Sequence, residues 1–215
     1  MILVHPSKPS ENGLPIASFF MYSELLLLIG ISVSLGYTPG PNNAVASYSG
    51  FNFGIKKTIP LILGVWLGYT TLVILINFVL ISTFVKYPII QEIIRILGTI
   101  FLFYLAYKIS FTNSSTEDKK ENPVKFFDTF IFQFLNPKGV MAAITLISKF
   151  VKEDNYLTSS LSVIIVCSLT AITSITVWAF LGKFLRGFAT NINFIKRFNY
   201  AMSLLLILCI IGFYI

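Results

Sequence analysis

The sequence predicts an all-α integral membrane protein with six transmembrane helices, arranged as two inverted three-helix repeats whose first and fourth helices are broken at proline. Hydrophobic residues make up 55% of the 215 residues and charged residues only 12%, whereas a soluble domain carries about 25% charged residues. The mean hydropathy of the chain is +0.81. Apolar runs long enough to cross the hydrocarbon, which takes about 20 helical residues, give the expected number of helices.

The first break is predicted after an apolar run at residues 18–37, which follows a polar tail at residues 1–17. Prolines on both sides of a glycine cannot continue a helix, because proline lacks an N–H and glycine readily adopts a positive φ. Open backbone at membrane depth is tolerated only when it is buried in protein or lines a wet cavity. The predicted substrate-binding residues at this break are Thr38, Pro39, Gly40, Pro41, Asn42 and Asn43.

Glu24 lies near the start of the first span. It is either an interfacial carboxylate that reaches the headgroups or a site for a proton or cation, because acids within a membrane are costly and usually functional. The sequence leaves both interpretations open.

The second and third spans are predicted at residues 58–85 and 89–109. Gly64 and Gly68 are typical of a close contact between helices. Glu92 and Arg95 are three residues apart at the start of the third span and are expected to pair. The first half therefore covers residues 18–110, and a polar linker at 111–125 leads to the second half at 126–215.

The fourth run, residues 126–151, is the least apolar. Helical spacing of 100° per residue places four polar residues within an arc of about 140°: Asp128, Thr129, Gln133 and Asn136. Pro137 then breaks or kinks the helix. The alternative is a kink whose polar groups are satisfied by neighbours, but Asp128 and Lys138 are expensive to bury, which favours a cavity. Gln133, Asn136, Pro137 and Lys138 are the predicted substrate-binding residues here.

The fifth and sixth spans are predicted at residues 157–182 and 198–215. Lys and Arg beside the spans divide ten against five between the two sides. The positive-inside rule then places the loops after spans one, three and five, including the linker, in the cytoplasm and both termini outside. Three spans per half give the halves opposite orientations, and each half has its break in its first span, which is the pattern of an inverted repeat.

Several function classes are not supported by the sequence. There is no Ser/His or Cys/His set for an enzyme, no interleaving of basic and aromatic residues for nucleic acid, and no motif for a cofactor. Cys167 and Cys209 form no C-x-x-C pair and are expected to be small core residues. The single histidine cannot build a metal site. Metal-ion efflux and a non-transporting membrane scaffold remain as alternative functions.

Four stretches resemble the lysine exporter and homoserine/threonine exporter (LysE/RhtB) family of bacterial amino-acid efflux proteins. They are the run Thr38–Asn43, the glycines and basic pair that follow it (Gly50, Gly54, Lys56 and Lys57), Gly98 with residues 104–108, and Phe134 to Lys138, and the resemblance covers about residues 20–215. It implies export of amino acids across the bacterial inner membrane, energised by the proton gradient, with both proline elements lining the substrate path. The expected partners are an amino acid and lipid, with a monomer or a homodimer left open. Asp128 and Ala106 stand where the family often has glycine.

The mechanism predicted from these residues uses the two breaks. The substrate carboxylate meets the free N–H groups and amides around Pro41, Asn42 and Asn43. Its amino group meets carbonyls freed by the breaks, or Asp128, while Gln133 and Asn136 complete the site. Lys138 either supplies a second positive charge or points outward. Asp128 or Glu24 would carry the coupling proton.

Overall fold

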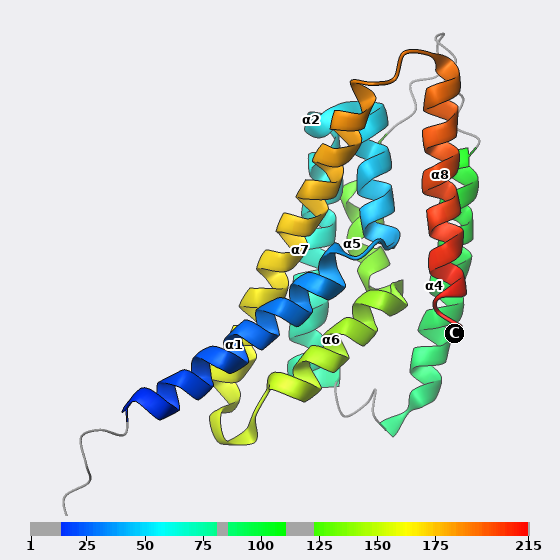
Figure 1. Cartoon of the computed structure of the whole chain (residues 1–215). Helices are drawn as coiled ribbons and strands as arrows, with labels where there is room; N and C mark the ends of the chain where they lie inside the picture. Colours follow the sequence, from blue (N-terminus) through cyan, green and yellow to red (C-terminus); the bar gives the residue numbers. More distant parts are fainter. Residues whose placement is uncertain (1–13, 81–85, 111–122, 215) are drawn as a thin grey trace, which may run out of the picture.

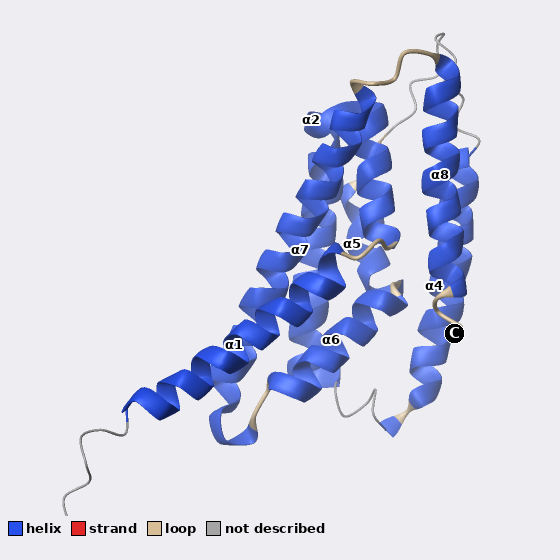
Figure 2. Cartoon of the chain, viewed as in Figure 1, coloured by secondary structure: helices blue, strands red, loops and turns tan. Residues whose placement is uncertain are grey.

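The computed structural model describes residues 14–80, 86–110 and 123–214, and these are almost entirely helical (Figures 1 and 2). No strand occurs in that part of the chain, and the prediction of an all-helical protein is confirmed. In chain order the elements are α1 (Leu14–Tyr37), α2 (Pro41–Leu75), the π-helical turn η1 (Ile76–Leu80), α4 (Pro88–Ser110), α5 (Phe126–Leu135), α6 (Pro137–Phe150), the 3-10 turn η2 (Glu153–Asn155), α7 (Tyr156–Arg186) and α8 (Ile192–Ile211).

Residues 1–13 of the expected tail and residues 111–122 of the expected linker lie outside the described residues. Helix α1 begins at Leu14, inside the segment expected to be tail. Proline is tolerated in the first turn of a helix, where its missing N–H has no intrahelical partner. Pro15 is therefore compatible with this earlier start.

Four helical stretches in the described residues are long and apolar enough to cross a membrane: Pro41–Val79, Ile89–Ser110, Glu153–Arg186 and Ile192–Ile211. The pair α5 and α6 makes a fifth if it is counted as one bent span, whereas the apolar part of α1, Ser23–Tyr37, is shorter. Large apolar side chains on the outer faces are widely exposed, for example Ile100 at 61% and Leu157 at 63%. Such surfaces are unfavourable in water, so the chain is a multi-pass membrane protein.

Helix α2 reverses direction at Gly54, whose φ of 75° is open to glycine and strained for other residues. Figure 1 shows the segment before Gly54 rising between α7 and α8 and the segment after it descending behind α7. The side chains of Ser49 and Thr58 meet across the reversal at 2.9 Å. Although α2 is numbered as one element, it therefore consists of the two arms of a helical hairpin.

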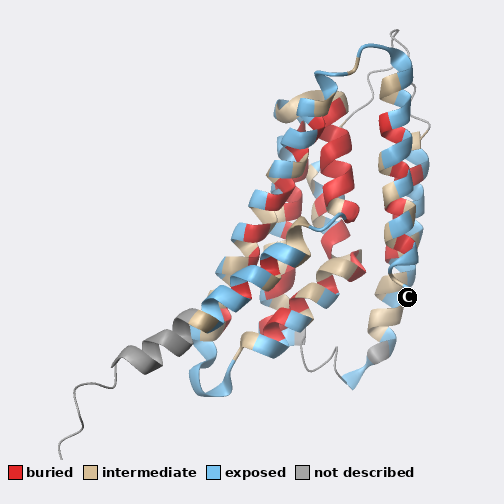
Figure 3. Cartoon of the chain, viewed as in Figure 1, coloured by how far each residue is buried: buried red, intermediate tan, exposed pale blue. Residues whose placement is uncertain are grey.

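The core is centred on α2, which packs most extensively on α7 and α5, while α4 pairs with α8 (Figure 3). A Cβ at Gly64 or Gly68 would clash with the backbone of α5, which confirms the predicted close helix contact. One apolar cluster includes Leu61, Phe132 and Leu206. A second cluster around Leu72 packs the lower part of α2 on α6 and α7. Together these contacts hold the ends of α1, α5 and α6 near the centre of the molecule.

Candidate functional site

The first helix break lies between α1 and α2, where three residues are non-helical. Asn43, which is 5% exposed, donates from Nδ2 to the carbonyl oxygens of Gly36 at 2.9 Å and Thr38 at 3.0 Å. Ser174 Oγ on α7 donates to the same Gly36 oxygen at 2.8 Å. Side chains therefore satisfy the carbonyls that α1 leaves open at its end. The extended Gly40 precedes α2 and supplies no side-chain cap for its free N–H groups.

The second break is a single residue. Asn136 lies between α5 and α6 with φ −88° and ψ 99°, and the two helices are bent by 60°. Pro137 opens α6, where its missing N–H costs nothing. Asn136 is 2% exposed, and its Oδ1 is buried without a hydrogen-bond partner in the described structure. A buried acceptor of this kind is uncommon and calls for a donor.

The two breaks contact each other directly, although they are about a hundred residues apart in the chain. Lys138 Nζ donates to the carbonyl oxygens of Thr38 at 2.9 Å and Pro39 at 3.3 Å. Asn42 Nδ2 donates to Gln133 Oε1 at 2.8 Å, and Gln133 Nε2 donates back to Asn42 Oδ1 at 3.1 Å. The start of α2 is thus joined to the end of α5, and the first break is joined to the start of α6.

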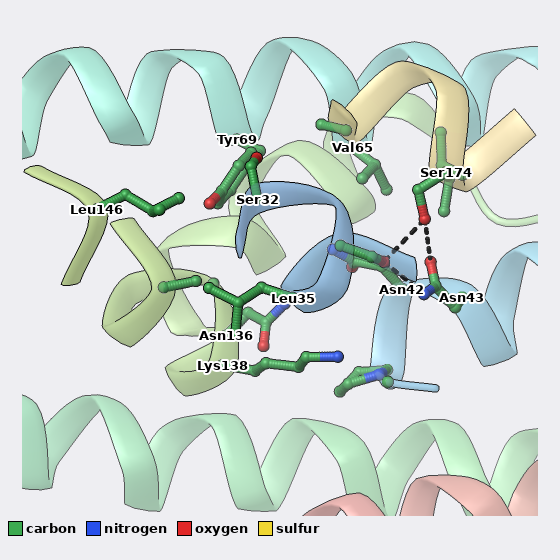
Figure 4. A pocket seen from close by; sticks show the side chains of 17 residues that line it. Ser32, Leu35, Asn42, Asn43, Val65, Tyr69, Asn136, Lys138, Leu146 and Ser174 are labelled. Atoms are coloured by element: carbon green, nitrogen blue, oxygen red, sulfur yellow. Dashed lines mark hydrogen bonds between the residues drawn. The ribbon is translucent and has the colours of Figure 1, made fainter. Parts of the chain in front are cut away.

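A cavity of about 80 Å³ lies between the breaks (Figure 4). A single water needs about 10–15 Å³ by the same measure, so several water-sized groups fit. The first residues of α2 and α6 line it, together with Ser32, Tyr69 and Ser174. Helix N-termini carry a partial positive charge and free N–H groups. Lys138 is the charged side chain among the described lining residues, so the site is suited to an anionic group.

Most of the predicted binding residues meet at this place. Six of them line the cavity: Gly40, Pro41, Asn42, Asn43, Asn136 and Lys138. Thr38, Pro39 and Pro137 line a larger neighbouring cavity, which also includes Lys138. Gln133 is fully buried behind Asn42 and donates to the Thr129 carbonyl at 2.8 Å.

The two predicted acidic residues are placed elsewhere. Asp128 is exposed in the first turn of α5, where Oδ2 accepts from the backbone N–H of Lys125 at 3.3 Å. This is a helix-capping position at the edge of the predicted polar arc, whereas Thr129 and Gln133 of that arc are buried. Glu24 accepts from Lys152 Nζ at 2.6 Å, and its side chain is 49% exposed. Its placement fits the interfacial interpretation, and neither acid is among the residues that line the cavity.

Sequence reasoning did not single out Ser32, Tyr69 and Ser174 as cavity residues. Serine within an apolar helix commonly bonds back to its own backbone, and tyrosine is common in membrane helices. Neither signal distinguishes a cavity wall from ordinary packing. Only the positions of α1, α2 and α7 around the breaks bring these side chains together.

Apolar helices, interrupted backbone and a polar cavity between the interruptions define the class as a membrane transporter. The family model described as LysE type translocator matches residues 33–215, and the chain belongs to this family. The cysteine/O-acetylserine efflux proteins of Salmonella choleraesuis (strain SC-B67) and Salmonella typhimurium (strain LT2) are each 29% identical over 174 residues, which is 80% of this chain and 88% of theirs. The protein of that name from Escherichia coli (strain K12) is 25% identical over 173 residues, with the same coverage. No solved structure matches significantly.

The resemblance to the LysE/RhtB family is therefore confirmed, and with it the prediction of an amino-acid efflux transporter. Membership of a translocator family implies a transporter and not an enzyme. The enterobacterial relatives and the apolar helices also support a multi-pass protein of the bacterial inner membrane. The described residues hold no group of three or more His, Cys, Asp or Glu that could bind a metal ion.

Proposed function

We propose that the protein exports small zwitterionic amino acids, of the cysteine or O-acetylserine kind named for its relatives, and binds them between the two helix breaks. The observation that carries this proposal is the convergence of two helix N-termini on one cavity beside Lys138. Interrupted membrane helices whose N-terminal ends face an anionic substrate group are typical of transporters.

Each end of the substrate has a matching set of groups. The carboxylate is held by the free N–H groups at the starts of α2 and α6 and by the Lys138 ammonium. The substrate ammonium donates to Asn136 Oδ1, which has no other partner among the described residues. Asn42 and Gln133 pair with each other and fix the start of α2 instead of binding substrate directly.

The proposal includes the six-span inverted repeat. Helix α1 and the arm of α2 before Gly54 form the first span, and the arm after Gly54 forms the second. Helix α4 is the third span, α5 with α6 the fourth, and α7 and α8 are the fifth and sixth. Rocking of the two halves about the breaks alternates access to the cavity.

The cytoplasmic side is proposed to be the end where α4 and α7 finish and α5 and α8 begin. These ends and the reversal at Gly54 lie together in Figure 1. The basic residues in or beside these ends are Lys56, Lys57, Lys108, Lys125, Lys183, Arg186, Lys196 and Arg197. An excess of Lys and Arg marks the cytoplasmic side, so both termini face outside in this proposal.

Export is proposed to be coupled to proton entry, with Glu24 and Asp128 as the candidate proton carriers. Neither touches the cavity, so the coupling would act through movement of α1 or α5. In proteoliposomes with an imposed pH gradient, Glu24→Gln or Asp128→Asn should then export at a rate that no longer responds to the gradient. An unchanged response in both variants excludes these two residues as carriers.

The central test measures efflux of labelled L-cysteine and O-acetyl-L-serine from proteoliposomes that contain the wild type, Lys138→Ala or Lys149→Ala. Lys149 is an exposed lysine near the end of the same helix. Loss of the cavity charge should lower efflux by at least about tenfold, because a hydrogen bond to a charged group contributes roughly 1.5–3 kcal/mol. Lys149→Ala should match the wild type. Equal efflux by all three proteins would contradict the proposed site.

A further inference from the structure

A second and larger cavity of about 710 Å³ adjoins the first. It lies between the two breaks, α4 and α8, and Lys138 is common to the walls of both cavities. Its volume falls within the range of about 300–1,000 Å³ that small-molecule sites occupy. Lys138, which bonds to Thr38 and Pro39, therefore stands at the boundary between the two cavities.

The larger cavity contains both signs of charge. Glu92 and Arg95 of α4 line it and form an ion pair with each other, and each side chain is more than a third exposed. The remaining wall is largely apolar, with Leu205 and Leu208 from α8 among its members. An acid and a guanidinium on the same helix face provide complementary charges for the ammonium and the carboxylate of one zwitterion.

Arg95 also retains unused donor capacity. Nη1 donates to the Phe213 carbonyl at 3.3 Å and Nη2 bonds to Glu92. Nε is buried and has no hydrogen-bond partner in the part of the chain that the structure describes. A guanidinium presents five N–H donors in a planar fork that matches a carboxylate. A small movement of the Glu92 carboxylate would therefore free Arg95 for a second acceptor.

We propose that this cavity is a second substrate station, in which Arg95 binds the carboxylate and Glu92 the ammonium of the exported amino acid. This proposal rests on the proposed function, since it assumes the same substrate and the same orientation of the protein in the membrane. Glu92 and Arg95 are the fifth and eighth residues of α4, at the end opposite the basic one. The second station is then on the exit side, and the Lys138 contact with the first break separates it from the central site.

The test is a calorimetric titration of the full-length protein in lipid nanodiscs with O-acetyl-L-serine. The wild type should bind two molecules per chain. The double variant Glu92→Gln/Arg95→Gln removes both charges without leaving either one unpaired, and it should keep one binding event and weaken the other by at least about tenfold. Asn136→Ala should affect the other event, and Lys149→Gln should bind as the wild type does.

A transport measurement provides an independent readout. External O-acetyl-L-serine should slow efflux of the labelled compound from proteoliposomes by occupying the exit station, and this inhibition should be at least about tenfold weaker in the double variant. A single binding event that Asn136→Ala removes and the double variant leaves unchanged would overturn the second station while preserving the proposed function. Absence of both binding and efflux in the wild type would overturn the proposed function itself.

Discussion

The two helix breaks differ in how fully their polar groups are satisfied. At the first break, Asn43 and Ser174 bond to the open carbonyls of α1, and Trp178 Nε1 donates to the Tyr37 oxygen at 3.3 Å. At the second break, the side-chain amide oxygen Oδ1 of Asn136 is buried without a partner in the described residues. Hydrogen bonds from side chains therefore hold the first break in place, whereas the second break has a free hydrogen-bond acceptor that a ligand can use.

The largest effect on stability is expected where α4 presses on the second break. A Cβ at Gly98 would clash with the carbonyl oxygen of Leu135 and approach Pro137 Cδ at 2.9 Å. Gly98→Ala should therefore lower stability by about 1–3 kcal/mol, the usual cost of overpacking. Thermal unfolding in detergent measures this. Gly30→Ala is the matched control, because nothing lies within 4 Å of a Cβ there, and a similar loss in both variants would contradict the close contact.

The next largest effect on stability is expected when the side-chain hydrogen bonds at the first break are lost. Asn43→Ala removes the bonds to Gly36 and Thr38, and interhelical hydrogen bonds in membranes are worth about 0.6–2 kcal/mol. Stability should fall by roughly that amount in the same unfolding assay. Ser174→Ala should cost less, since Asn43 still occupies the Gly36 oxygen. A larger loss from Ser174→Ala would reverse the roles given to these side chains.

Asn136→Ala should separate function from stability. Because its Oδ1 has no partner in the described structure, truncation should change stability by less than about 1 kcal/mol. Efflux should nevertheless fall about tenfold, because the substrate ammonium loses its acceptor. The informative result is the loss of efflux relative to the loss of stability, which should be larger for Asn136→Ala than for Asn43→Ala. If Asn136→Ala kept full efflux but had lowered stability, Asn136 would have a structural role, as Asn43 does at the first break.

The smallest effect is expected away from both breaks. Glu24→Gln removes a half-exposed ion pair with Lys152, and such pairs contribute less than about 1 kcal/mol. Its unfolding temperature should be close to that of the wild type, also at high salt. A loss comparable to that of Gly98→Ala would show that this pair anchors α1.

The sequence predicts where the helices end better than it predicts which residues contact each other across the breaks. Proline and glycine restrict the local backbone directly, so the ends of α1 and α5 coincide with Pro39 and Pro137 to within two residues. The bonds from Lys138 to Thr38 and between Asn42 and Gln133 join positions about a hundred residues apart. Nothing in local sequence encodes such a pairing.

Asp128 shows a further limit of reading a helical face. Its angular position alone placed it with Gln133, but it lies in the first turn of α5 and its carboxylate accepts from the Lys125 N–H. The exposure of a side chain depends on its position along the helix as much as on its angle around the helix axis. Acidic side chains are favoured in the first turn of a helix, whichever face they lie on. The six-span count and the inverted repeat depend on how the half-helices sit in a bilayer and stay predictions.

The reversal at Gly54 has a consequence for biogenesis. The arm from Pro41 to Gly54 is only about 21 Å long at 1.5 Å per residue, whereas the hydrocarbon is about 30 Å thick. The arm therefore cannot cross the hydrocarbon by itself and depends on α1, with which it forms the proposed first span. Because the arm after Gly54 packs against it, we expect the two arms to settle in the bilayer together as a hairpin during insertion.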